Sequence, residues 1–164
     1  FNAGEVDVNG LELLLNYDFS NQESTIKIPF NLGYTFTNTE FKNSFGSDED
    51  LWGEVTSVDE LPYLSKHQFN IGISLEHEKY EFNFNGRFNG KFRTQAGKGS
   101  IPEDELVNSN FVIDFSGKYF ITENFSATVN IINLLDNVYA ASRVPAGLRP
   151  GHPFGAYLGI QFKF

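Results

Sequence analysis

Residues 80–93, YEFNFNGRFNGKFR, alternate strictly between two kinds of side chain. Every second residue from Tyr80 to Phe92 is aromatic or glycine, and every residue between them is polar or charged. Successive side chains of a β-strand point to opposite faces of its sheet, so the pattern predicts a strand with one apolar and one polar face. A fold built from such strands has to supply an apolar environment on one side only.

The same period of two recurs along the whole chain, with apolar positions separated by Asn, Thr, Ser, Gln or charged residues. We predict strands at residues 11–19, 26–37, 68–76, 80–93, 110–121, 125–131 and 154–164. Most of these segments are about 9–14 residues long, against about 5–6 in typical soluble sheets and about 9–11 in tilted membrane-spanning strands. The lengths favour strands that cross a bilayer.

The connections between the predicted strands alternate in length. Residues 20–24, 77–79 and 122–124 form short turns, and residues 44–65, 95–107 and 140–152 form long polar loops. Short turns at one edge and long loops at the other are typical of outer-membrane barrels. Aromatic residues gather near the short turns, as in the girdle at a membrane interface. They are Tyr17, Phe19, Tyr80, Phe82, Tyr119, Phe125, Phe162 and Phe164.

We therefore predict an all-β fold, an antiparallel transmembrane β-barrel segment of about seven strands. Bacterial single-chain barrels have even strand numbers, and the chain shows neither an initial methionine nor a signal peptide, so we expect the C-terminal part of a larger barrel. A polar inner face rich in Asn, Glu, Lys and Arg favours a wide, wet lumen. The alternative is a soluble antiparallel sandwich, which rarely places so many aromatic residues on one face of a strand.

Composition and motif content argue against several other classes of protein. Acidic residues outnumber basic ones 21 to 12, which argues against a nucleic-acid partner. Cysteine is absent, and His67, His77 and His152 have no Cys or His neighbour at metal-ligand spacing. No nucleophile-elbow or zinc-protease motif occurs. No apolar run is long enough for a transmembrane helix. We expect no catalytic residue, no enzyme activity, no metal site and no cofactor.

The acidic loop at residues 47–60, SDEDLWGEVTSVDE, has some of the spacing of a calcium-binding loop. The residues near the required offsets are Asp48, Asp50, Gly53 and Asp59. Trp52, however, stands where an oxygen ligand belongs, and the flanking segments are strands rather than helices. A solvated acidic loop is the favoured interpretation. Trp52 and Tyr63 fit two roles, as anchors that pack the loops or as ligand contacts.

Basic residues are the candidate binding groups. They are Arg87, Lys91 and Arg93 on the polar face of the predicted strand 80–93, and Arg143 and Arg149 in the last long loop. Guanidinium groups bind carboxylates bidentately, so we predict that these residues contact an anionic ligand in the lumen. For the three strand residues the alternative is charge pairing with Glu76, Glu81 and Asp114 on neighbouring strands.

Three stretches resemble one family, the TonB-dependent outer-membrane receptors. Residues 130–142, NIINLLDNVYAAS, resemble its N-L-[L/F]-D-x-x-Y signature, with matches at Asn133, Leu134, Leu135, Asp136 and Tyr139. The final YLGIQFKF, which ends on Phe164, resembles the terminal signal recognised by the barrel-assembly machinery. Residues 60–76 and 143–164 resemble the branch of receptors for ferric citrate and related iron chelates.

The resemblance implies a barrel of about 22 strands with an N-terminal plug that carries the TonB box. Neither plug nor box occurs in residues 1–164, so the whole chain is expected to be a C-terminal portion of the barrel. The implied function is TonB-energised uptake of a ferric chelate through the bacterial outer membrane, with iron present only as part of the cargo. Alternatives are a passive porin, or an importer of another nutrient such as cobalamin or a glycan.

The implied partners are outer-membrane lipid and lipopolysaccharide, the TonB complex through the plug, the barrel-assembly machinery and the ferric chelate. The signature from Asn133 to Tyr139 has a structural interpretation. Leu134 and Leu135 are adjacent, which interrupts the alternation, so one of them points inward or a bulge intervenes. Asp136 is expected to accept hydrogen bonds from the backbone or from a neighbouring strand.

Overall fold

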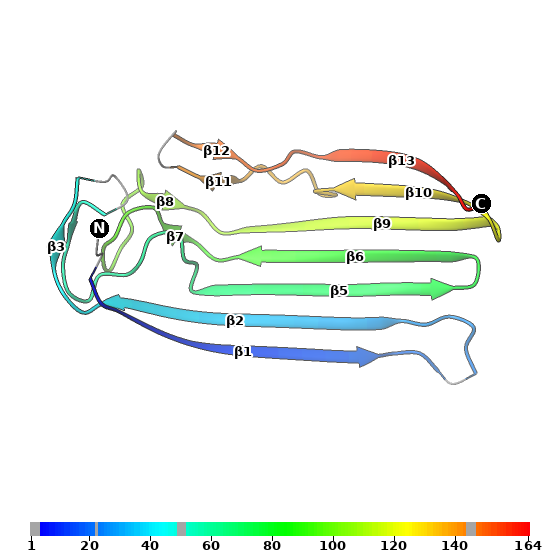
Figure 1. The fold of residues 1–164 in the computed structure, drawn as a ribbon, viewed down its shortest axis with the longest axis horizontal. Helices are drawn as coiled ribbons and strands as arrows, with labels where there is room; N and C mark the ends of the chain where they lie inside the picture. Colours follow the sequence, from blue (N-terminus) through cyan, green and yellow to red (C-terminus); the bar gives the residue numbers. More distant parts are fainter. Residues whose placement is uncertain (1–3, 22, 49–51, 144–146) are drawn as a thin grey trace.

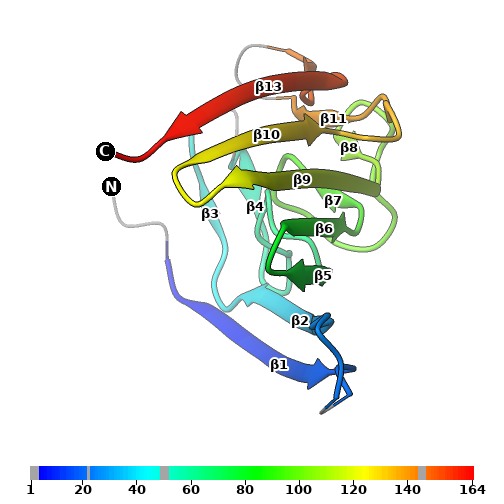
Figure 2. The same ribbon diagram turned by 90° about the vertical axis from the view of Figure 1, so that its right-hand side faces the viewer.

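The computed structural model describes residues 4–21, 23–48, 52–143 and 147–164. Its main element is one antiparallel sheet in which seven long strands follow one another in chain order (Figure 1). The strands are β1 (Val6–Asp18), β2 (Pro29–Phe41), β5 (His67–His77), β6 (Tyr80–Asn89), β9 (Asn110–Thr122), β10 (Phe125–Ile132) and β13 (Gly155–Phe162). Seen from the short-turn end, they form an open arc (Figure 2). No helix in the described residues is long and apolar enough to cross a membrane.

The seven predicted strands are confirmed, but several of their boundaries are wrong. β1 begins at Val6 rather than at residue 11, and β2 ends at Phe41 rather than at residue 37. β2 begins at Pro29 rather than at residue 26, because proline has no backbone N–H and is tolerated at the first position of a strand. β6 ends at Asn89 rather than at residue 93. At Gly90 the backbone passes so close to the Ser65 hydroxyl that an added Cβ would lie 2.9 Å from it, and the chain leaves the sheet there.

The strand register assembles one continuous apolar face. A row of paired residues crosses five strands through Phe30, Ile73, Phe84, Phe115 and Ile131. Their large side chains stay partly exposed, and Phe84 keeps 43% of its surface accessible. A wide apolar face with no protein layer over it suits contact with hydrocarbon.

The opposite face of the sheet is polar and forms its own hydrogen bonds. The Ser74 hydroxyl donates to Asn83 Oδ1 over 2.6 Å, between β5 and β6. Arg87 forms an ion pair of 3.0 Å with Asp114, between β6 and β9. Side chains of this kind fit a water-filled lumen.

The connections confirm the predicted asymmetry. The β1–β2, β5–β6 and β9–β10 turns lie at one end of the sheet, and the three long loops lie at the other (Figure 1). The predicted aromatic girdle is formed at the short-turn end. Ring centroids there are 4.7 Å apart for Tyr17 and Phe19 and 5.2 Å apart for Tyr80 and Phe82.

Each long loop contains a short two-stranded ribbon that the alternation does not predict. The ribbons are β3 (Phe45–Gly46) with β4 (Glu54–Val55), β7 (Phe92–Arg93) with β8 (Leu106–Val107), and β11 (Ala140–Ser142) with β12 (Arg149–Pro150). Among the described residues, the almost fully buried Phe41, Val55 and Val107 all lie in or beside these loops. Dry protein packing is therefore concentrated at the loop end of the sheet.

Candidate functional site

The signature that begins at Asn133 forms a tight turn at the end of β10. Asn133 is completely buried and has a positive φ of 51°, a conformation that asparagine tolerates better than most residues. Its Nδ2 donates to the backbone oxygens of Asn137, over 3.0 Å, and His152, over 2.9 Å. Its Oδ1 accepts from the Asn137 backbone N–H over 3.0 Å. One amide thus ties the turn to the last loop.

The rest of the signature extends these contacts. The Asp136 carboxylate accepts from the Phe154 backbone N–H over 3.1 Å, just before β13. Leu134 donates its N–H to the Ile113 oxygen of β9 over 2.7 Å, while Leu135 is exposed. The strand ends at Ile132, so the adjacent leucines belong to the turn, with Leu134 half-buried and Leu135 exposed, and β10 needs no bulge to accommodate them. These contacts are structural, since they join β9, β10 and the approach to β13.

Tyr63 connects the first long loop to the other two. Its ring lies 5.7 Å from that of Phe92, and its N–H donates to the Arg93 oxygen over 2.8 Å. Its hydroxyl accepts from the Arg143 N–H over 3.4 Å. Arg143 in turn donates Nε to the Leu106 oxygen over 2.8 Å. The three loops are therefore joined through hydrogen bonds rather than standing apart.

Trp52 and the acidic loop pack locally. The Trp52 ring meets the Phe41 ring edge-on at 5.8 Å. Asp59, one of the calcium candidates, is buried and accepts from the Thr56 N–H over 2.7 Å, which closes a turn. Asp50 lies outside the described residues. Within the described residues no group of three or more His, Cys, Asp or Glu side chains could hold a metal.

The five basic candidates do not converge on one site. Arg87 lies on the polar sheet face and is paired with Asp114. Arg143 links two loops, and Arg149 is exposed on β12. The alternation predicts Lys91 and Arg93 on the polar face of β6. This placement is wrong, because the strand ends before them, at Asn89.

Lys91 and Arg93 instead line a cavity of about 270 Å³ at the base of the long loops. The Glu60 carboxylate lies inside this cluster, 2.6 Å from Lys66 Nζ and 3.4 Å from Arg93 Nε. The sequence pattern does not identify Glu60 or Lys66 as members of a site. Glu60 and Arg93 are 33 residues apart and meet only because two loops fold together, so no local spacing signals their contact.

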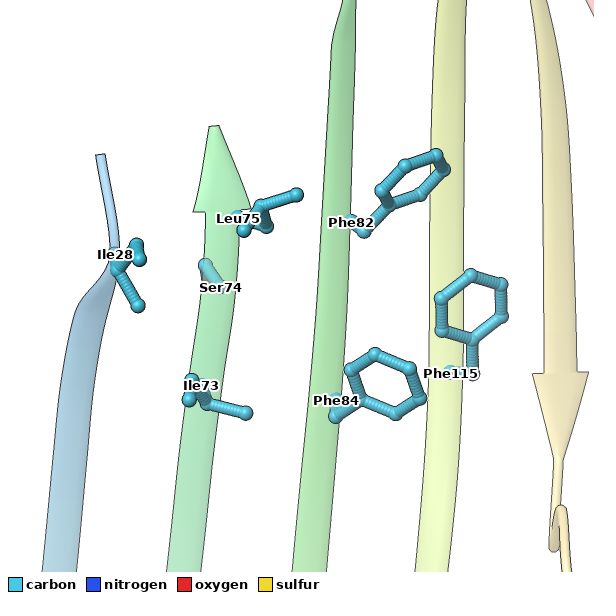
Figure 3. Close-up of a pocket in the computed structure, with 7 residues that line it drawn as sticks. All are labelled: Ile28, Ile73, Ser74, Leu75, Phe82, Phe84 and Phe115. Atoms are coloured by element: carbon cyan, nitrogen blue, oxygen red, sulfur yellow. The ribbon is translucent and has the colours of Figure 1, made fainter. Parts of the chain in front are cut away.

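A second cavity, of about 380 Å³, lies on the apolar face over β5, β6 and β9 (Figure 3). Its lining side chains are Ile28, Ile73, Leu75, Phe82, Phe84 and Phe115, together with Ser74. The Ser74 hydroxyl is bonded to Asn83 on the opposite face. No charged group lines this cavity, so it is a crevice in the apolar surface and not a site for an anion.

An antiparallel sheet with one apolar face, one polar face, short turns at one end and long loops at the other is a wall segment of an outer-membrane β-barrel. Residues 1–134 match the model of the family described as TonB dependent receptor-like, beta-barrel. The chain belongs to this family. It is accordingly a protein of the bacterial outer membrane, and it is not an enzyme.

Solved structures share the fold at low identity. The siderophore receptor PiuA from Acinetobacter baumannii has a TM-score of 0.75 at 19% identity, with 99% of this chain and 22% of that chain covered. The ferric citrate transporter FecA has a TM-score of 0.62 at 16% identity, with coverages of 99% and 29%. The copper transporter OprC has a TM-score of 0.63 at 16% identity, with coverages of 97% and 23%.

The chain spans less than a third of each of these structures. At such identities the similarity establishes the fold alone. No curated protein matches the sequence significantly.

Proposed function

We propose that the chain forms part of a TonB-energised outer-membrane transporter that takes up a ferric chelate similar to ferric citrate. The observation that carries the proposal is the family match over residues 1–134. Two structures of the same fold, named a siderophore receptor and a ferric citrate transporter, add support. The resemblance of residues 60–76 and 143–164 to the ferric citrate branch narrows the class of cargo.

In this proposal each surface has its own task. The apolar face contacts lipid, the polar face lines the lumen, and the joined loops face the exterior, where the chelate arrives. Arg143 and Arg149 in the last loop are the proposed contacts for its carboxylates. The TonB complex would act through a plug inside the lumen, Phe164 would engage the barrel-assembly machinery, and iron would pass only as cargo.

Energy dependence tests the proposal directly. Cells that carry the full-length protein should take up radioactive iron supplied as citrate, and uptake should fall to background when a protonophore removes the proton-motive force. A passive porin would continue to admit the chelate after that treatment. Excess cobalamin or an oligosaccharide should not compete. Energy-dependent uptake of labelled cobalamin or of a labelled oligosaccharide, with no uptake of ferric citrate, would assign the transporter to another nutrient.

A further inference from the structure

The cavity at the base of the long loops is built from residues far apart in sequence. It lies where β5 begins and β6 has just ended. Three cationic side chains and one carboxylate line it, namely Lys66, Lys91, Arg93 and Glu60. Lys66 and Arg93 share Glu60, while Lys91 has no ion-pair partner among the described residues. The cluster therefore keeps an excess of positive charge.

Arg93 is the unusual member of this cluster, because its side chain is only 3% exposed. Its Nε donates to Glu60 and its Nη2 donates to the Gly99 oxygen, over 3.2 Å. In the described part of the chain, Nη1 has no hydrogen-bond partner. No buried side-chain nitrogen or oxygen of the described residues lacks a hydrogen-bond partner, so Nη1 is accessible to solvent and free to donate to an acceptor that enters from outside.

Gly97 keeps that donor accessible. A Cβ at position 97 would lie 2.5 Å from Nη1, so a larger residue would displace the guanidinium. The glycine is held in place by backbone hydrogen bonds with Glu60, one of them 2.7 Å long. The loop is thus positioned to leave room at Nη1, with a basic environment around it.

We infer that this cavity binds an oxyanion, a carboxylate or a phosphate group, through Arg93 Nη1 with Lys91 and Lys66 supplying further positive charge. A volume of about 270 Å³ is large enough for one such group. Planar guanidinium donors suit both kinds of oxyanion. The assignment goes beyond the proposed cargo, because it does not require that ferric citrate is transported.

Two sources could supply the group. One is a soluble anion at the exterior. The other is a phosphate on a lipid headgroup, because His67 at the cavity also reaches the edge of the apolar face, where its Nδ1 lies 2.8 Å from the Tyr34 hydroxyl. Both sources present an oxyanion to the same donors, and the two arms of the experiment below distinguish a soluble anion from a lipid phosphate.

The first arm titrates the full-length protein in detergent with inorganic phosphate and with iron-free citrate by calorimetry. The second reconstitutes the protein in phosphatidylcholine vesicles with and without bisphosphorylated lipid A, and quantifies by mass spectrometry the lipid that stays bound. The variants are Lys91→Gln, which removes an exposed charge, and Gly97→Ala, which crowds Nη1. Lys98→Gln is the matched control, because Lys98 is exposed in the same loop but does not line the cavity.

Loss of one charge-assisted hydrogen bond corresponds to about tenfold weaker binding or more. We expect that loss for Gly97→Ala, a smaller one for Lys91→Gln, and a change within about twofold for Lys98→Gln. Losses in the first arm identify a soluble anion, and losses in the second identify a lipid phosphate; either supports the site. Unchanged binding of all three probes in both cavity variants overturns it. Ferric citrate uptake by the wild type is measured separately. If that uptake is absent, the binding data still show whether the cavity binds an oxyanion.

Discussion

Asn133 ties its own turn to the last loop through one buried amide, which makes it a sensitive position. Replacement by alanine would leave the Asn137 N–H and two backbone oxygens, of Asn137 and His152, without their partner. Each unsatisfied buried group costs about 1–3 kcal/mol. We expect Asn133→Ala to lower the free energy of unfolding of the full-length barrel by about 3 kcal/mol or more. Denaturant titration in lipid vesicles measures the loss.

Asn133→Gly separates the two possible causes of that loss. Glycine adopts the positive φ of 51° without strain but restores none of the hydrogen bonds. If the hydrogen bonds dominate, glycine and alanine should destabilise by similar amounts. A glycine variant as stable as the wild type would show that only backbone strain matters at this position. Leu135→Ala, on the exposed side of the same turn, serves as the near-neutral reference.

The seven long strands could be predicted because their pattern is local. Alternation at every second residue is sufficient to define a strand with one apolar face. The three ribbons could not be predicted, because strands such as β7 are two residues long and pair with partners in another part of their loop. The position of Arg93 could not be predicted for the same reason, because it depends on contacts between residues far apart in sequence. The alternation runs on to residue 93, but the close approach at Gly90 ends β6, and only the folded loops bring Arg93 to Glu60.

The long loops should behave as one unit, since Arg143 in the last loop forms hydrogen bonds with both of the others. Its Nε donates to the Leu106 oxygen and its N–H to the Tyr63 hydroxyl. Arg143→Ala removes the side-chain contact. We expect faster hydrogen exchange in β7 and β8 of the full-length protein, by about a factor of ten if the lost bond contributes about 1.4 kcal/mol.

Arg149→Ala is the control for this coupling. Arg149 is exposed on β12, and within the described residues no hydrogen bond joins it to either of the other loops. Its replacement should leave exchange in β7 and β8 unchanged. Equal acceleration in both variants would mean that the last loop as a whole, and not the Arg143 contact, protects these segments.

At the scale of the molecule, the sheet depends on what surrounds it. Large side chains on its apolar face stay exposed in the described part of the chain, and β1 and β13 form the two edges of the described sheet. Large residues on β13, such as Leu158 and Ile160, keep 86% and 75% of their surface exposed. In hydrocarbon, unpaired strand edges are costly, because no water satisfies their backbone groups. The seven strands are therefore a wall that is stable within a closed barrel and a bilayer, with the joined loops as its internally packed part.

The assignment of the two faces predicts opposite responses at neighbouring positions. Phe84 lies in the middle of β6 on the apolar face, and Asn85 lies beside it on the polar face. Arginine on a lipid-facing strand near the bilayer midplane costs about 2–4 kcal/mol. Phe84→Arg should therefore lower the unfolding free energy of the full-length protein in vesicles by about that amount. Asn85→Arg should change it little, because its side chain stays in water near Asp114. The reverse order of the two effects would place the lumen on the aromatic side and overturn the orientation of the wall.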